Sequence, residues 1–274
     1  MQVFCEILSY LLPVFYFGLI YVYYQIFTGK NRKFERWTKT LLLTLLFIHG
    51  SEIVLRQIYL KTMPLSSTYD AISFLAFSIL LVYYIIERSF NNKASGFFIM
   101  LFAFFPALFA AFNHHWRAEK NPLLATPTFA IHASLNIIGY TALTIGAIYA
   151  VMFLIQYKNM KQRRFNRFYE QLPPVTYLEN MSKRAVLIGI ILMGVGIFLG
   201  HVQTKQMFGH FFISDPKVIF TDLIWVLYVA VYVGAKVKRW SSRTMAYFNV
   251  LGFTLLSAGG AIVFLMIKSF HKFY

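Results

Sequence analysis

The chain has 274 residues, of which 58% are apolar and only 13% are charged, whereas a soluble domain carries about 25% charged residues. Lysine and arginine outnumber the acidic residues by 26 to 10, which gives a net charge of +16. This composition excludes an ordinary soluble domain and predicts a multi-pass membrane protein; because cytoplasmic loops of such proteins collect Lys and Arg, we expect no nucleic-acid partner. The single cysteine, Cys5, excludes a disulfide framework and a CxxC redox pair.

Eight apolar segments are each long enough to cross a bilayer, since a spanning helix needs roughly 20 apolar residues. The first has no basic amino-terminal region and is longer than a signal-peptide core, so we interpret it as a true span. We therefore predict an all-α protein of the cell inner (cytoplasmic) membrane, with one domain over residues 1–274. In chain order, the predicted spans are residues 3–27, 40–60, 69–87, 96–113, 130–156, 184–206, 218–236 and 244–268.

The distribution of basic residues predicts which loops face the cytoplasm. The loops after the first, third, fifth and seventh spans, together with the ends of the adjoining spans, hold 18 Lys and Arg. The other loops and the carboxyl-terminal tail, counted in the same way, hold seven. Because basic loops stay in the cytoplasm, this asymmetry places both termini outside. The basic half of the loop at residues 157–183 is expected on anionic lipid headgroups, with docking of a cytoplasmic partner as the alternative. Pro173 and Pro174 break any helix there.

The second predicted span carries ionisable residues, which are unfavourable inside a bilayer and usually face a cavity or each other. His49, Glu52 and Arg56 are three and four residues apart, so they share one face of the helix. Glu52 and Arg56 form either an internal ion pair or a functional polar face. His49 is either a hydrogen-bonded packing residue or a ligand near the membrane centre.

Histidines gather on the predicted outer side of the membrane. None of the seven falls in a predicted cytoplasmic loop, and all except His49 lie at or beyond the outer face. Neutral imidazole is the commonest metal ligand, and paired histidines commonly hold haem iron. Zinc is the competing metal, and it requires further Cys, Asp or Glu ligands. The outer histidines are His114, His115, His132, His201, His210 and His271.

The stretch "QMFGHFFISDPK", residues 206–217, is predicted to be an outer loop and is rich in phenylalanine. Such rings can stack on a flat conjugated ligand, which favours a macrocycle over a bare ion; an aromatic belt at the membrane interface is the alternative. Gly209 would let a backbone or ring approach closely, and Pro216 suits the first turn of the next span. Basic candidates for the anionic edge of a ligand are Lys205, Lys217 and Arg56.

These features resemble the cytochrome c assembly superfamily of haem-handling membrane proteins, which includes CcsA, CcmC, CcmF and HemX. The family hallmark is an outer WGxxWxWDPK loop followed by a span with a further Trp; "FGHFFISDPK" aligns with the loop without gaps, and "DLIWVLYVAVY" matches the span. "GVGIFLGHV", "IHASLNIIGY", "QLPPVTYLENM" and the stretch from His49 to Phe77 match neighbouring family segments. The resemblance runs from about residue 45 onward, and the length and eight spans are nearest to HemX-like members.

The resemblance implies one outer haem whose iron is held by two histidines that flank the aromatic loop. By position these axial ligands are His132 and His271, and His49, His201 and His210 are alternative or second-site ligands. In this chain Phe208, Phe212 and Ser214 replace the loop tryptophans of the family. The implied pocket wall comprises Phe208, Gly209, Phe211, Phe212, Asp215 and Trp225, and the polar or propionate-facing candidates are Arg56, Lys205, Lys217 and Glu52.

We therefore expect a membrane protein that holds or transfers haem, of the b type, at the outer face and transforms no substrate. The expected role is cytochrome c maturation or control of haem supply, with haem, the lipid bilayer and a cytochrome c assembly or haem-synthesis protein as partners. Two alternatives stay open. One is a haem-free regulator of a cytoplasmic haem-synthesis enzyme, acting through residues 157–183, and the other is a small-solute transporter that uses Glu52 and Arg56.

Overall fold

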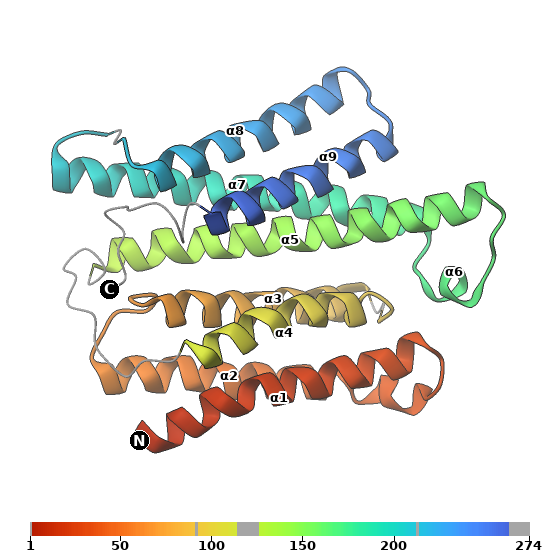
Figure 1. Cartoon of the computed structure of the whole chain (residues 1–274), viewed down its shortest axis with the longest axis horizontal. Helices are drawn as coiled ribbons and strands as arrows, with labels where there is room; N and C mark the ends of the chain where they lie inside the picture. Colours follow the sequence, from red (N-terminus) through yellow and green to blue (C-terminus); the bar gives the residue numbers. More distant parts are fainter. Residues whose placement is uncertain (1, 91–92, 114–125, 212–213, 263–274) are drawn as a thin grey trace. The chain divides into compact units, whose positions relative to one another are not determined.

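The computed structural model describes residues 2–90, 93–113, 126–211 and 214–262, and within these ranges every regular element is a helix (Figure 1). The chain divides into two compact units. Unit 1 comprises Met1–Ala130 and Arg163–Pro173, and unit 2 comprises Ile131–Gln162 and Pro174–Tyr274. Compactness alone does not say whether the units fold independently, so the single-domain assignment stays a prediction.

Unit 1 is a four-helix bundle. Helix α1 packs against α2 and α4, and α3 packs against the same two helices, so the four close a ring around one interior. A short 3₁₀ helix joins α1 to α2, and a short helix, α6, also belongs to this unit. The elements are α1 (Gln2–Phe27), the 3₁₀ helix (Arg32–Arg36), α2 (Thr38–Leu60), α3 (Thr68–Phe90), α4 (Gly96–Phe112) and α6 (Arg167–Gln171).

The interior of unit 1 contains hydrogen-bonded polar groups as well as apolar side chains. The Glu87 carboxylate is fully buried and accepts hydrogen bonds from the hydroxyls of Tyr23 and Thr38, the latter at 2.5 Å. Gly96 begins α4 at this place, where a Cβ would collide with the Tyr23 ring and with the Tyr83 hydroxyl. Buried carboxylates are tolerated only when such donors surround them.

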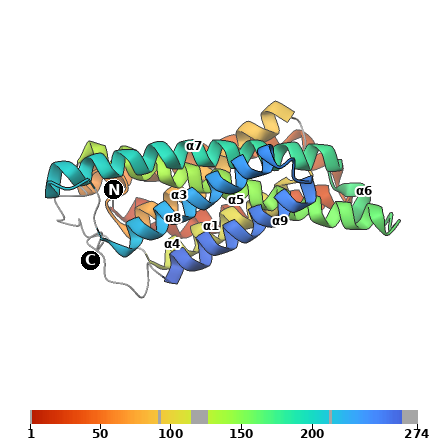
Figure 2. The ribbon, with the colours of Figure 1, turned by 90° about the horizontal axis from the view of Figure 1, so that it is seen from above.

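Unit 2 is built from most of α5 together with α7, α8 and α9. Figures 1 and 2 both show α8 running beside α9, and each of these two helices also contacts α7. Helix α9 continues through a π-helical stretch, Leu255–Gly259, and is helical up to Ile262, the last of the described residues. The elements are α5 (Pro127–Lys161), α7 (Val175–Phe208), α8 (Pro216–Val237) and α9 (Ser242–Thr254).

Small residues bring the backbones of α5 and α7 close together. A Cβ on Gly139 would stand 2.9 Å from the Met193 amide nitrogen, and one on Gly189 would stand 3.1 Å from the Gly139 carbonyl oxygen. In a membrane, where apolar burial provides no drive for helix association, close packing of this kind is a main source of helix–helix stability. The buried core beside this contact consists of Leu143, Val186, Ile190, Met193, Ile224, Tyr228 and Leu256.

The predicted fold class is confirmed: within the described ranges the protein is all-helical, with seven helices long and apolar enough to span a membrane. The fourth predicted span corresponds to α4, a shorter apolar helix of 17 residues. Helices α5 and α7 extend beyond the predicted spans, so residues 157–183 include two helix ends and α6 rather than loop alone. The predicted break at Pro173 and Pro174 is confirmed, since α6 ends at Gln171 and α7 begins at Val175.

Candidate functional site

Three helix ends meet at one end of unit 2, and most of the described residues of the predicted haem site lie there. The beginning of α5 contributes His132, the end of α7 contributes His201, and Asp215 caps the beginning of α8. Trp225 lies near the middle of α8. The predicted aromatic loop, residues 206–217, is shorter in the structure: its first three residues belong to α7 and its last two to α8, which leaves residues 209–215 between the helices. Of these, residues 212 and 213 lie outside the described residues.

His132 is held in one orientation by the backbone of α7. Its Nδ1 lies 2.7 Å from the carbonyl oxygen of Gly196 and 3.1 Å from Nδ2 of Asn136; because a carbonyl only accepts, the shorter contact assigns the proton to Nδ1. In the neutral ring the lone pair is then on Nε2, which is the arrangement of a metal-binding histidine whose other nitrogen bonds to a backbone carbonyl. Asn136 lies one turn further along α5, and its side-chain amide donates to the His132 carbonyl at 2.9 Å.

Glycines of α7 make room for this histidine and for two residues near it. A Cβ on Gly200 would stand 2.5 Å from Cε1 and 2.8 Å from Nδ1 of His132, and one on Gly196 would stand 2.8 Å from Nδ2 of Asn136. A Cβ on Gly194 would stand 2.9 Å from Cζ2 of Trp225, whose indole nitrogen donates to the Ile190 carbonyl at 2.8 Å. The stretch "GVGIFLG" is therefore a contact surface for side chains of α5 and α8.

His201 links α7 to the loop and to α8. Its Nδ1 lies 3.1 Å from the Phe211 carbonyl oxygen, and its Nε2 lies 3.1 Å from Oδ2 of Asp222. The Phe211 ring stacks on the imidazole, with 5.4 Å between the ring centroids. A carbonyl and a carboxylate both accept, so both ring nitrogens of His201 face hydrogen-bond acceptors. Iron binding by His201 therefore requires that one of these contacts be released.

The loop between α7 and α8 owes its course to a helix cap at each end. Gly209 ends α7 with φ +77°, a left-handed conformation that favours glycine, and its N–H donates to the Lys205 carbonyl at 3.0 Å. No atom of the described residues lies within 4 Å of the position that a Cβ on Gly209 would take, so the expected close approach of a ligand at Gly209 stays a prediction. Asp215 caps α8 by accepting from the amide of Lys217 at 2.8 Å, and Pro216 occupies the first turn as predicted.

The remaining predicted site residues around the loop differ in their exposure. Phe208 is 46% exposed, and His210 and Lys205 are also exposed, so all three are open to a ligand or to lipid and water. Phe212 and His271 lie outside the described residues, as do His114 and His115. Across the described ranges, no three His, Cys, Asp or Glu side chains are grouped as metal ligands. A structural zinc site uses about four such groups, whereas the predicted haem uses two histidines.

His49 is completely buried in unit 1, and both of its ring nitrogens have hydrogen-bonding neighbours. Nδ1 lies 2.9 Å from the Tyr16 hydroxyl, and Nε2 lies 2.9 Å from Oγ of Ser73. The Tyr16 ring is also perpendicular to the imidazole, at 5.8 Å between centroids. In this conformation His49 connects α1, α2 and α3, and it would have to release a partner to bind iron.

Arg56 forms its ion pair with the next helix rather than along its own. Nε of Arg56 lies 2.9 Å from Oδ1 of Asp70, with the two side chains 1% and 4% exposed. The guanidinium also lies over the Tyr69 ring, 4.3 Å from its centroid. Glu52, one turn away, accepts hydrogen bonds from Ser9 at 3.0 Å and from Tyr69 at 2.8 Å. Both predicted polar-face residues therefore have partners inside unit 1.

Sequence reasoning missed the residues that position these groups. Asp70 was not predicted as the partner of Arg56; its place in the first turn of α3, where acids are favoured, was the available signal. Gly196 and Gly200 are four residues apart and so face one side of α7, a small-residue pattern typical of close packing in membranes. That pattern could have been read as a contact surface.

The fold and this site define a multi-pass helical membrane protein with an oriented histidine beside an aromatic loop. Residues 65–271 match the family model described as cytochrome C assembly protein, so the chain belongs to that family, which confirms the resemblance seen in the sequence. The matched range includes His132, the aromatic loop and His271, whereas His49, Glu52 and Arg56 precede it.

Named relatives cover most of the chain at low identity. Protein HemX of Brevibacillus brevis is 24% identical over 242 residues, which is 88% of this chain and 89% of the relative. Cytochrome c biogenesis protein CcsA of Guillardia theta is 25% identical over 213 residues, 70% of each chain. The protein of the same name from Prochlorococcus marinus (strain MIT 9515) is 23% identical over 267 residues, 88% of this chain and 84% of the relative.

Proposed function

We propose that this protein binds haem at the outer face of the cytoplasmic membrane and holds or passes it there, in cytochrome c maturation or in control of haem supply. His132 and His271 are the axial ligands. The observation that supports the proposal most is the position of His132 on α7, which we call the seat of His132. There the Nδ1–H of His132 bonds to the Gly196 carbonyl, and the imidazole ring fills the space that Gly200 leaves. That seat orients Nε2 as a ligand nitrogen before any haem arrives.

The residues near His132 have the chemistry that a haem site requires. When bound, haem supplies an iron that takes the two imidazoles and a macrocycle with anionic propionates. Phe208, Phe211 and Phe212 supply an apolar wall, and Trp225 is fixed nearby through its bond to Ile190. Lys205 and Lys217 are the cations for the propionates. We no longer assign Arg56 to this role, because its charge is balanced by Asp70 inside unit 1.

The proposal includes a topology and a chemical role. Both termini are outside, and the basic residues between residues 157 and 183 face the cytoplasm, as the asymmetry of Lys and Arg favours. The chain then binds and releases haem, of the b type, without transforming a substrate. A cytochrome c assembly or haem-synthesis protein is the partner that gives or takes the haem.

The test is the absorption spectrum of the purified protein with single histidine replacements. A bis-histidine iron gives a low-spin, six-coordinate spectrum, and His132→Gly or His271→Gly should each shift it and regain it with added imidazole. His201→Gly and His210→Gly are the matched comparisons, and neither should show imidazole rescue. If His201→Gly is rescued and His132→Gly is not, the ligand assignment is wrong. If the wild-type protein shows no haem by the pyridine haemochrome assay, the haem-free regulator is favoured.

A further inference from the structure

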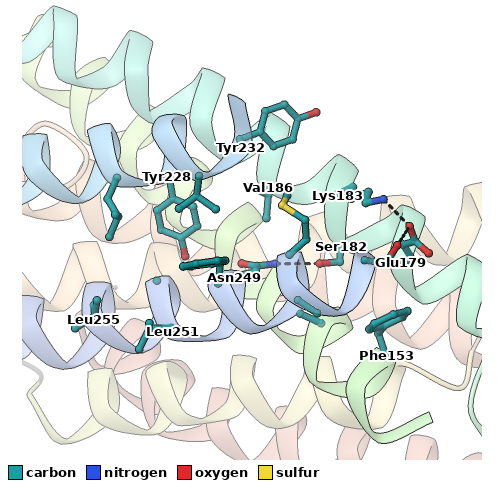
Figure 3. Close-up of a pocket in the computed structure, with 18 residues that line it drawn as sticks. Phe153, Glu179, Ser182, Lys183, Val186, Tyr228, Tyr232, Asn249, Leu251 and Leu255 are labelled. Carbon is teal, nitrogen blue, oxygen red and sulfur yellow. Dashed lines mark hydrogen bonds and ion pairs between the residues drawn. The ribbon is translucent and has the colours of Figure 1, made fainter. Parts of the chain in front are cut away.

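A cavity lies in unit 2, at the end of the helices opposite to His132. It is enclosed by α5, α7, α8 and α9 and has a volume of about 230 Å³ (Figure 3). Its walls are mainly apolar and aromatic, with Phe153 and Phe248 among them. Leu227, Leu251 and Leu255 line it and are 41%, 53% and 44% exposed, so the cavity opens where these side chains would meet lipid.

Two buried polar atoms that line this cavity have no hydrogen-bond partner among the described residues. They are the hydroxyl of Tyr228 and Oδ1 of Asn249. The two residues are only 4% and 6% exposed. Leaving such groups unpaired in an apolar environment is unfavourable, and the cost is larger where water is scarce. Both atoms therefore point to a bound group that supplies hydrogen bonds.

The orientation of the Asn249 amide is fixed by a chain of hydrogen bonds. Ser182 Oγ donates its single proton to the Gly146 carbonyl at 3.0 Å, so the same oxygen accepts from Nδ2 of Asn249, also at 3.0 Å (Figure 3). The acceptor Oδ1 is left for the cavity. Tyr228 is positioned by Gly252, where a Cβ would stand 3.2 Å from the hydroxyl oxygen.

The charges at one edge of the cavity are already balanced, which indicates an uncharged ligand. Glu179 accepts from Lys183 at 2.5 Å and also from the Ser242 hydroxyl. The volume is below the roughly 300–1,000 Å³ of sites that enclose a whole drug-sized ligand. The cavity therefore suits one part of a larger molecule whose remainder lies along the open apolar side.

We propose that this cavity binds a membrane-soluble amphiphile whose apolar body carries a hydroxyl group. The hydroxyl accepts a hydrogen bond from Tyr228 and donates one to Asn249, which satisfies both buried atoms at once. A bare acyl chain would leave both unsatisfied, and a ketone or ether would leave Asn249 without a donor. Phenols and aliphatic alcohols share the required chemistry, and the affinities of the two kinds of probe distinguish them.

The test uses the full-length protein in lipid nanodiscs with three probes that share a twelve-carbon chain. Dodecylhydroquinone and dodecanol carry hydroxyls, and 1,4-dimethoxy-2-dodecylbenzene carries none. We expect the hydroxyl probes to raise the melting temperature in a saturable manner, and the dimethyl ether, which can accept from Tyr228 but cannot donate to Asn249, to have a clearly smaller effect. The tighter of the two hydroxyl probes identifies the source as a phenol or an aliphatic alcohol.

Tyr228→Phe separates ligand binding from folding. The hydroxyl has no hydrogen-bond partner among the residues that the structure describes, so its removal should leave the melting temperature without probe unchanged or raised, while probe affinity falls about 5- to 10-fold. Tyr140→Phe is the matched control: its hydroxyl bonds to Ser257 at 2.9 Å outside the cavity, so stability should fall and affinity should not. Equal binding of the dimethyl ether, unchanged affinity in Tyr228→Phe, or no saturable binding, as expected if the cavity holds only water, would each overturn the proposal.

Discussion

A single methyl group added at Gly200 is expected to displace the His132 ring, the proposed haem ligand, while the imidazole itself is unchanged. In Gly200→Ala the new Cβ would stand 2.5 Å from Cε1 of His132, so the ring must move away from the Gly196 carbonyl that orients it. Changes that disturb the orienting partner of a metal-bound histidine weaken metal binding by about 10- to 100-fold. The haem-to-protein ratio after titration with haemin should fall accordingly, while the protein stays folded.

Gly18→Ala is the matched control for that substitution. Gly18 is an exposed glycine in α1, and no described atom lies within 4 Å of the position where its Cβ would stand. Both changes add the same methyl group to a helix, so they share any gain in helix propensity. If the two variants bind haemin equally well, the seat of His132 has no role in haem binding.

The buried pair of Arg56 and Asp70 is expected to be a strong stabilising contact between α2 and α3. Asp70→Asn leaves a buried guanidinium without its carboxylate, and breaking a buried pair in this way costs roughly 3–5 kcal/mol of unfolding free energy. Thermal unfolding in detergent measures it. The double variant Arg56→Met, Asp70→Leu removes both charges and should recover most of the loss.

The comparison for this prediction is the partly exposed pair of Lys183 and Glu179 on α7. Their side chains are 42% and 25% exposed, so Lys183→Gln should cost only roughly 0–1 kcal/mol. A loss in Asp70→Asn no larger than in Lys183→Gln would show that the buried pair is dispensable. If Arg56 has a functional role beyond packing, the stable double variant should lose haem binding or solute transport.

At the level of residues, sequence could identify the groups but not their partners. His132 could be selected because an imidazole at the end of an apolar span is uncommon and matches a family position. The contact between His132 and Gly200 could not be predicted, because this contact depends on the register between α5 and α7, which a single sequence does not give. The same applies to Arg56: Glu52 lies one turn away on the same helix, and only the packing of α2 on α3 brings Asp70 to 2.9 Å.

At the level of elements, the "DPK" sequence is expected to act as the start signal of α8. Asp215→Ala removes the acceptor for the amides of Lys217 and Val218, which should cost about 0.5–2 kcal/mol and fray the first turn. Hydrogen exchange of residues 217–220 should therefore become faster. Asp215→Asn keeps the capping oxygen and should exchange like the wild type; if the Ala variant does too, the cap does not hold this turn.

The positions of the helices could be predicted from the length of the apolar segments, whereas several helix ends could not. Apolar runs mark what lies in hydrocarbon, and seven of the eight predicted spans correspond to helices long enough to cross it. Helix α5 continues to Lys161 and α7 starts at Val175 because polar helix formers such as Lys, Gln and Glu extend a helix into water, where hydropathy gives no signal. The break between them was predictable because two prolines cannot continue a helix.

At the level of the whole molecule, the number of crossings depends on α4. Its 17 residues span about 26 Å, slightly less than the roughly 30 Å of hydrocarbon, and spans of this length are at the lower limit. If α4 did not cross the bilayer, every later loop would lie on the opposite side of the membrane, and the most basic of these loops would face outside. We therefore expect α4 to cross. A reporter active only outside the cytoplasm should then be active when fused at Lys120 and inactive when fused at Arg164.

The same reporter at the carboxyl terminus tests the proposed site together with the topology. Eight crossings place residue 274 on the side of the amino terminus, and the excess of Lys and Arg in the alternate loops places that side outside. The fusion at Tyr274 should therefore be active, which puts His271 on the same side as the aromatic loop and the beginning of α5. An inactive fusion at Tyr274, with the fusion at Lys120 still active, would separate His271 from His132 by the bilayer. No single haem could then take both as axial ligands, whereas the seat of His132 on α7 would be unaffected.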